Sequence, residues 1–425
     1  MKPEPSSGED EKDGIVTGDV IGDTAYSERF VLRLLLKFAN LDTLSEELKE
    51  KTFEGDLCTL WDMTAERDVV VFLQKHDTLK LINFSWPIIE SPRIIEILIG
   101  IIGNMCCQKE VTEKLLEMKT FVKSLLLYIQ SDDSLIIIQL LRLINSSLFL
   151  AQDNFVSTWI ELFISSGYSN NLYYILKNSS NKELLVTGLE NFNTICSYCN
   201  TERHRTQFFG HFVNSVAMES LSTAFIEVVV NQKDSCERDE LERILLISLQ
   251  ILLNLVGFEK SCEMYNENKD DVTKMISIVL SYYEEKLNNK EIDLDLVDII
   301  ESTTTIVRAL EIAEVCSHKQ YFRPSYSMWK TLSEIAIFDK NGGASFENED
   351  KEELQVFSKK FKACLSTLIF TYMEKATIEN LLKVLDEIGD DYDEFLSLVR
   401  DVDLAKAVSE RCSGYRTRLK ETENC

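Results

Sequence analysis

The sequence predicts an all-α protein, an α-solenoid of armadillo/HEAT-like helical repeats (an α-α superhelix). Only five prolines and 15 glycines occur in 425 residues, so turn signals are few and long helices with short connections are favoured. Apolar residues recur at helical spacing through most of the chain. Two consecutive three-helix copies also share a period of 47 residues, which is typical of such repeats.

The chain divides into six expected segments. They are a disordered acidic N-terminus (1–17), N-terminal capping helices (18–65), armadillo-like repeats (66–338), a flexible loop (339–350), C-terminal capping helices (351–410) and a disordered basic tail (411–425).

The repeat is clearest in two adjacent copies, each with two shorter helices, a polar tetrad and a longer apolar third helix. The tetrads are Ser131–Ser134 and Asn178–Asn181. The expected helices are 111–118, 121–130 and 135–151 in the first copy, and 154–165, 168–177 and 182–199 in the second. The polar run 231–239 is the expected position of an insertion into a later copy.

The helix expected from Pro92 to Cys107 is apolar around most of its circumference, so it should be buried on most sides. Its polar and small residues fall within about a third of the circumference. Similar stripes occur on later third helices. The stripe residues predicted to line a partner-binding groove are Arg93, Glu96, Gly100, Asn104, Gln139, Arg142, Asn145, Gln250 and Asn254.

Two interpretations of these stripes stay open. In armadillo units the third helix lines the inner surface, where Asn side chains can bond a partner's backbone. Equally, any solvated helix face is polar. Gly100 and Gly103 each cost about 1 kcal/mol relative to Ala, which either close helix packing or a crossing partner backbone would explain.

An import-receptor function is not favoured. Importin-type arrays place a Trp four residues before the groove Asn, but here Gly100 and Gln250 precede Asn104 and Asn254. The aromatic wall for a Lys-rich peptide is therefore expected to be missing.

Little in the sequence points to catalysis or cofactors. There are four histidines, and no phosphate-binding Gly-rich loop, HExxH or GxSxG motif. Cys196 and Cys199, with His204 and His211, have the residue types of a zinc site, but two small apolar residues at a helix end are the simpler interpretation. We expect no enzyme activity, no metal and no cofactor.

The net charge of −26 disfavours direct binding to nucleic acid or to an anionic membrane. A basic protein partner is easier to reconcile with it. The eleven cysteines are an odd number at irregular spacing, which indicates thiols in a reducing compartment. No run of about 18 uncharged apolar residues occurs, so no membrane span is expected.

Three stretches carry a family resemblance: Gly18–Ser27, Leu60–Gln74 with its Leu-Trp-Asp-Met-Thr start, and Gly100–Met105. As a set they resemble the serum amyloid A-like family, known for a role in synoviocyte proliferation. The resemblance implies an armadillo-type helical protein that promotes cell proliferation and is nuclear or nucleocytoplasmic, although the sequence contains no clear import signal.

These observations predict a non-catalytic, monomeric protein-interaction scaffold that holds an extended or helical segment of another protein in its groove. The alternative is an adaptor for the transport or assembly of a basic partner. For the scaffold, charge reversal of Arg93 and Arg142 is expected to weaken partner binding and leave thermal stability nearly unchanged.

Overall fold

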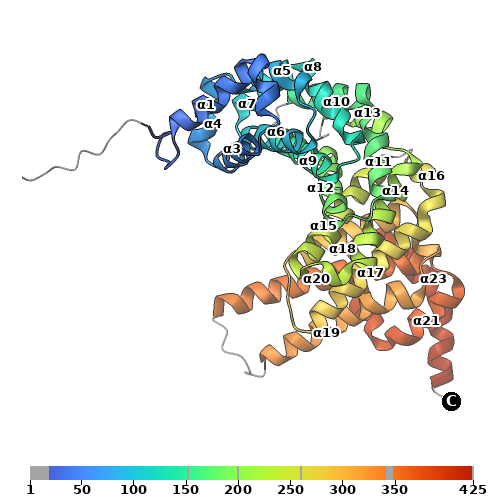
Figure 1. Ribbon diagram of the computed structural model, residues 1–425. Helices are drawn as coiled ribbons and strands as arrows, with labels where there is room; N and C mark the ends of the chain where they lie inside the picture. Colours follow the sequence, from blue (N-terminus) through green and yellow to red (C-terminus); the bar gives the residue numbers. More distant parts are fainter. Residues whose placement is uncertain (1–18, 151–152, 199–200, 259–260, 341–347, 424–425) are drawn as a thin grey trace, which may run out of the picture. The chain divides into compact units, whose positions relative to one another are not determined.

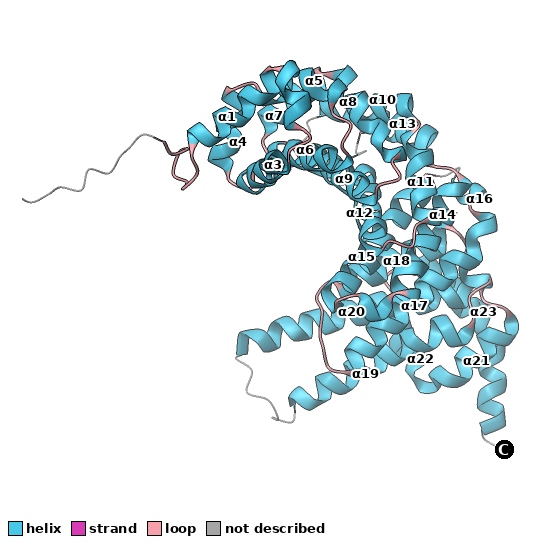
Figure 2. Cartoon of the chain, in the orientation of Figure 1, coloured by secondary structure: helices cyan, strands magenta, loops and turns pink. Residues whose placement is uncertain are grey.

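The computed structural model describes residues 19–150, 153–198, 201–258, 261–340 and 348–423. Within these ranges the chain is helical and contains no strand (Figure 2). Contacts group it into two compact units, Met1–Leu162 and Phe163–Cys425, and the division falls within one helix, α10. The all-α helical-repeat solenoid expected from the sequence is confirmed.

The first unit contains the helices α1 (Glu28–Ala39), α2 (Leu41–Glu47), α3 (Lys51–Met63), α4 (Arg67–Lys75), α5 (Thr78–Ser85), α6 (Pro92–Met105), α7 (Lys109–Glu117), α8 (Lys119–Leu126), α9 (Ser134–Phe149) and the first part of α10 (Asp153–Ser166).

The second unit contains the remainder of α10 and the helices α11 (Tyr168–Asn178), α12 (Lys182–Tyr198), α13 (Glu202–Phe212), α14 (Ser215–Ile226), α15 (Arg238–Val256), α16 (Ser261–Met264), α17 (Lys269–Asn288), α18 (Leu296–Ala309), α19 (Arg323–Lys340), α20 (Asn348–Lys375), α21 (Ile378–Ile388), α22 (Tyr392–Leu398) and α23 (Val402–Glu423).

In the first unit the longest apolar helices pack against one another in sequence. Helix α6 lies between α3 and α9. These three helices form one side of the unit, and α5 and α8 lie on the opposite side (Figure 1). Every residue of α6 from Ile94 to Gly103 is buried. We call α3, α6 and α9 the third helices of this unit.

The second unit repeats this pattern. Its third helices, α12, α15 and α18, pack in order, and α18 then packs against α20. A parallel series runs through α11, α14, α17 and α19. Within the units, α6, α15 and α18 therefore each bury one side against the preceding helix of their series and another against the following one, as expected for stacked repeats.

The helix bounds of the two clearest copies agree with the sequence prediction within two residues at nearly every end. Helix α9 begins one residue earlier than expected and α12 begins at the expected Lys182. The predicted disordered segment 1–17 lies outside the described residues, as do 341–347 of the predicted loop.

The expected basic tail differs from the structure, because α23 continues to Glu423 instead of ending at residue 410. Arg411 explains how this helix is attached. Its guanidinium donates to the carbonyl oxygens of Met373, at 2.8 Å, and of Glu374 and Ala376. These carbonyls lie at the C-terminal end of α20, where the helix leaves acceptors unsatisfied and favours a positive charge.

One further finding concerns helix length and composition. Among the described residues no single helix is long and apolar enough to cross a membrane. One bent pair of helices, Glu202–Phe212 with Ser215–Asn231, has sufficient length and apolar composition when the two are taken together, and only by those two criteria.

Replacing Arg411 should loosen the attachment of α23 to α20. Because hydrogen bonds from a charged group contribute about 1.5–3 kcal/mol, we expect Arg411→Ala to lower the free energy of unfolding by about 2 kcal/mol. Urea denaturation measures this change. Lys406→Ala is the matched control, since Lys406 lies on the same helix in an exposed pair with Glu410. Equal stability of the two variants would contradict this role of Arg411.

Candidate functional site: the polar faces of the third helices

The nine predicted groove residues fall in both units. Seven lie on α6 and α9 in the first unit, and Gln250 and Asn254 lie on α15 in the second. They are not equally accessible. Arg93, Arg142 and Gln250 are exposed and the three asparagines are half-buried, whereas Glu96, Gly100 and Gln139 are buried. The prediction that all nine line an open groove is therefore wrong for those three.

Arg93 and Glu96 form an ion pair within the first turns of α6. Arg93 Nη1 lies 2.7 Å from Glu96 Oε2, and the side chain of Glu96 is only 6% exposed against 44% for Arg93. Arg93 Nε also lies 3.7 Å from Glu54 Oε1 on α3. The Glu96 carboxylate accordingly raises the pKa of Arg93. Arg93 thus compensates a nearly buried charge.

This geometry changes one expectation from the sequence. Charge reversal at Arg93 would place three carboxylates together, one of them buried, and such an uncompensated charge is strongly destabilising. Arg93→Glu is therefore expected to lower stability, so it does not test partner binding cleanly.

Gly100 lies directly beneath the ring of Trp61. A Cβ atom added at Gly100 would lie 2.3 Å from ring atoms Cε2 and Cζ2 of Trp61, closer than real Cβ contacts. Gly103 is different, because its added Cβ would meet Leu143 of α9 at an ordinary 3.4 Å. Helix packing therefore explains Gly100 but does not require Gly103, and Gly100 lets α3 place a half-buried tryptophan on the stripe of α6.

Asn104 bonds to the end of the same neighbouring helix. Its Nδ2 donates to Thr64 Oγ1 at 2.9 Å and lies 3.5 Å from the carbonyl oxygen of Trp61. Thr64 is buried and follows directly after α3. The amide of Asn104 therefore bonds groups at the C-terminal end of α3. An aromatic residue, Trp61, lies beside this Asn, although no Trp occurs four residues before it in the sequence.

Helix α9 leaves only a narrow face exposed. Ten of its residues are buried, including Gln139, while Arg142 is exposed and Asn145 is half-buried. Near its two ends the helix also exposes the apolar side chains of Leu135 and Phe149. In the middle of this helix the accessible side chains therefore include one cation and one amide, the same pair of groups that Arg93 and Asn104 provide on α6.

In the second unit the stripe residues join α12 to α15. Asn193 Nδ2 donates to Gln250 Oε1 at 3.0 Å, and Arg243 Nη1 lies 2.7 Å from Glu190 Oε1. Asn254 instead donates to the backbone carbonyl of Gln250, one turn earlier on its own helix, at 2.8 Å. Polar contacts between consecutive third helices thus occur in both units.

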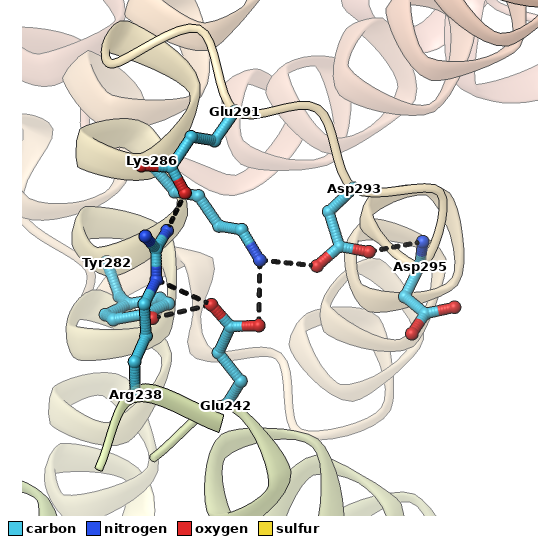
Figure 3. A network of polar contacts seen from close by, with 7 residues as sticks. All are labelled: Arg238, Glu242, Tyr282, Lys286, Glu291, Asp293 and Asp295. Carbon is cyan, nitrogen blue, oxygen red and sulfur yellow. Dashed lines mark hydrogen bonds and ion pairs between the residues drawn. The ribbon is translucent and has the colours of Figure 1, made fainter. Parts of the chain in front are cut away.

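A second set of polar contacts fixes α15 against α17, at positions that the sequence analysis did not identify (Figure 3). Lys286 Nζ lies 2.8 Å from both Glu242 Oε2 and Asp293 Oδ2, and its side chain is only 11% exposed. Tyr282 OH donates to Glu242 Oε1 at 2.8 Å, and Arg238 pairs with Glu291.

The ionisation of this network follows from its geometry. Burial opposes the charged form of Glu242 and Asp293, yet the hydrogen bonds from Lys286 prevail and lower the pKa of both carboxyls. Burial likewise opposes the charge on Lys286, but its two carboxylate partners raise its pKa. The arrangement neutralises the Lys286 cation between α15 and α17 and stabilises the packing of these two helices.

The residues considered for zinc do not gather in the part of the chain that the structure describes. Cys196 and His204 are buried, His211 is half-buried, and Cys199 lies outside the described residues. Burial lowers the pKa of His211. Among the described side chains no group of three or more His, Cys, Asp or Glu is arranged to hold a metal ion.

Sequence reasoning missed the partners that complete these faces, namely Glu54, Trp61, Thr64 and Asn193. Trp61 and Thr64 lie one helical turn apart at the end of an amphipathic segment. That spacing marks them as neighbours on one face, but only the pairing of α3 with α6 shows what they contact.

The contact between Trp61 and Gly100 yields a prediction. Ala normally stabilises a helix interior by about 1 kcal/mol over Gly, but Gly100→Ala must displace the indole ring, so we expect a net destabilisation of about 1–2 kcal/mol. Gly103→Ala, with ordinary contacts, should be neutral or stabilising. In a Trp61→Leu background Gly100→Ala should lose its penalty, as measured by chemical denaturation. The same penalty in both backgrounds would show that the ring is not the obstacle.

The Lys286 network predicts a pH dependence. Glu242 and Asp293 have lowered pKa values in the folded state, so their stabilisation is present above their ordinary pKa values and is lost as pH falls through the folded ones. We expect Lys286→Met to cost about 2–4 kcal/mol at pH 7 and less at pH 3. Thermal unfolding against pH tests this, with exposed Lys383→Met as control. A pH-independent loss would contradict it.

Comparison with known proteins supports the family resemblance. No family model matches the chain. Protein saal1 of Xenopus tropicalis is 30% identical over 195 residues, which are 43% of this chain and 41% of that protein. Protein saal1 of Danio rerio is 29% identical over 193 residues, covering 43% and 40%, and Protein SAAL1 of Homo sapiens is 27% identical over 184 residues, covering 40% and 38%.

A solved structure of an engineered protein aligns with 89% of this chain and 92% of its own at 9% identity and a TM-score of 0.43. The aligned region spans about two-fifths of the length of each SAAL1 relative. The resemblance expected from Gly18–Ser27, Leu60–Gln74 and Gly100–Met105 is thus confirmed, because about two-fifths of this helical-repeat chain is similar to SAAL1 (serum amyloid A-like 1) proteins.

Proposed function

We propose that this chain is a non-catalytic scaffold that binds another protein through the polar faces of its third helices. The observation that carries the proposal is the composition of the narrow exposed faces. On α6 and on α9, where most residues are buried, the accessible side chains include one arginine and one asparagine. Such groups suit the carbonyl, amide and carboxylate groups of a protein segment.

The face shared by α3 and α6 offers the best-defined contact surface. Trp61 is half-buried beside Asn104, whose Nδ2 is occupied by Thr64, so the amide oxygen is the atom left to accept a bond from a partner. Aromatic residues with a few placed polar groups are typical of protein-binding surfaces. This combination favours a protein partner over a small metabolite.

The biological role follows from the family resemblance and is part of the proposal. The protein would promote cell proliferation in the nucleus or cytoplasm, without a cofactor and without direct contact to nucleic acid. An adaptor for transport or assembly of a basic partner is the second candidate, favoured by the net charge of −26.

Arg142→Glu tests the scaffold role most cleanly, because Arg142 is exposed on α9. Lys123→Glu is the matched control, with the same charge change at an exposed position on the second helix of the same repeat. After equal melting temperatures are verified, proximity labelling in cells compares both variants with the wild type. We expect Arg142→Glu to lose a defined set of proteins at least fivefold and Lys123→Glu to retain it.

Two outcomes discriminate the candidates. Identical protein sets for both variants would contradict binding through the third-helix face. Loss of the set in both variants, with recovery that falls steeply as salt rises, would favour the adaptor that recruits a basic partner by overall charge.

A further inference from the structure

A cavity of about 330 Å³ lies in the second unit between α18, α20 and the short connection that precedes α23. One wall consists of Glu301, Thr304 and Thr305 on α18. The remaining lining residues are Lys360, Ala363, Cys364 and Thr367 on α20, and Arg400. None of its lining residues lies on α6, α9 or α15.

Two cations at this cavity lack a carboxylate partner. Lys360 and Arg400 are exposed, and neither forms an ion pair within the described residues. The neighbouring Asp401 does not compensate Arg400, because its carboxylate bonds Arg308 at 2.8 Å and caps the backbone of Leu404 at 3.0 Å. In a chain with 71 acidic residues, two cations that line one cavity and form no ion pair within the described residues are available to an external anion.

The α18 wall offers the opposite chemistry. The hydroxyls of Thr304 and Thr305 donate to carbonyls one turn earlier on their own helix, so their oxygens remain as acceptors. The carboxylate of Glu301 accepts from the thiol of Cys364 at 3.3 Å. Acceptors on one side and cations on the other match a peptide that presents backbone N–H groups and an acidic side chain.

We propose that this cavity binds an acidic side chain of an extended protein segment, with the carboxylate held by Lys360 and Arg400 and a neighbouring backbone N–H bonded to Glu301 or Thr305. The inference rests on the proposed function in one respect, since the ligand is part of a protein. It adds the chemical class of the segment and a location apart from α6 and α9.

Cys364 provides a reporter inside the cavity. Burial, with Glu301 as a further cause, raises the pKa of its thiol to about 12, so alkylation is slow and is followed over hours at pH 8.5. Bound peptide should slow it further. Exposed Cys107 in the first unit is the internal reference, and mass spectrometry of the full-length chain gives both rates.

The probes are the peptides acetyl-Gly-Glu-Glu-Gly-amide, its Gln-Gln and Lys-Lys counterparts, and inorganic phosphate. We expect the Glu-Glu peptide alone to protect Cys364 without affecting Cys107. Lys360→Gln and Arg400→Gln should each raise the peptide concentration needed for half protection about tenfold, because each removes a charged hydrogen bond. Lys359→Gln, adjacent on α20 but outside the cavity lining, should not change it.

Glu301→Gln should lower that concentration, since the amide keeps an acceptor oxygen for the backbone N–H and removes a negative charge near the bound carboxylate. Protection is expressed as a rate ratio within each variant, so changes in thiol reactivity cancel. Equal protection by the Gln-Gln peptide, protection by phosphate alone, unaltered protection in both cation variants, or no protection by any probe would each overturn the proposal. The Arg142 experiment is independent, because it changes a residue in the other unit.

Discussion

Within each unit the structure depends on the burial of a central third helix between the third helices before and after it. Helix α6 is buried along almost its whole length against α3 and α9, and α15 is enclosed in the same way by α12 and α18. A helix that is covered on most sides has few positions for polar groups, and buried polar groups need partners. The neighbouring third helix is the nearest source of such partners.

This constraint gives the polar stripes a structural role before any binding role. Asn104 bonds Thr64 across α3 and α6, and Asn193 bonds Gln250 across α12 and α15. Glu96 and its compensating Arg93 contact α3 through Glu54. The stripes therefore have a third role besides a binding groove and a solvated face, because some of their residues fix the position of consecutive repeats. The stripe residues that solvent reaches are the exposed subset, which includes Arg142.

The sequence predicted the features that depend on local pattern. Helices α9 and α12 follow from apolar periodicity and polar tetrads, and their bounds match closely because both signals lie within a few residues of the helix ends. The sequence could indicate that another group packs closely against Gly100, but it could not identify that group. Trp61 is 39 positions earlier, and only the pairing of α3 with α6 brings the two together. Arg411, bonded to carbonyls 35 to 38 residues away, and Lys286, bonded to Glu242 44 residues away, were missed for the same reason.

A double-mutant cycle on Asn104 and Thr64 tests the central claim, that stripe amides join consecutive third helices. Asn104→Ala, Thr64→Val and the double variant would be compared by urea denaturation at pH 7. The account predicts a coupling of about 1 kcal/mol, as expected for a part-buried hydrogen bond. Additivity within about 0.3 kcal/mol would contradict it, and Asn104 would then be available in full to a partner.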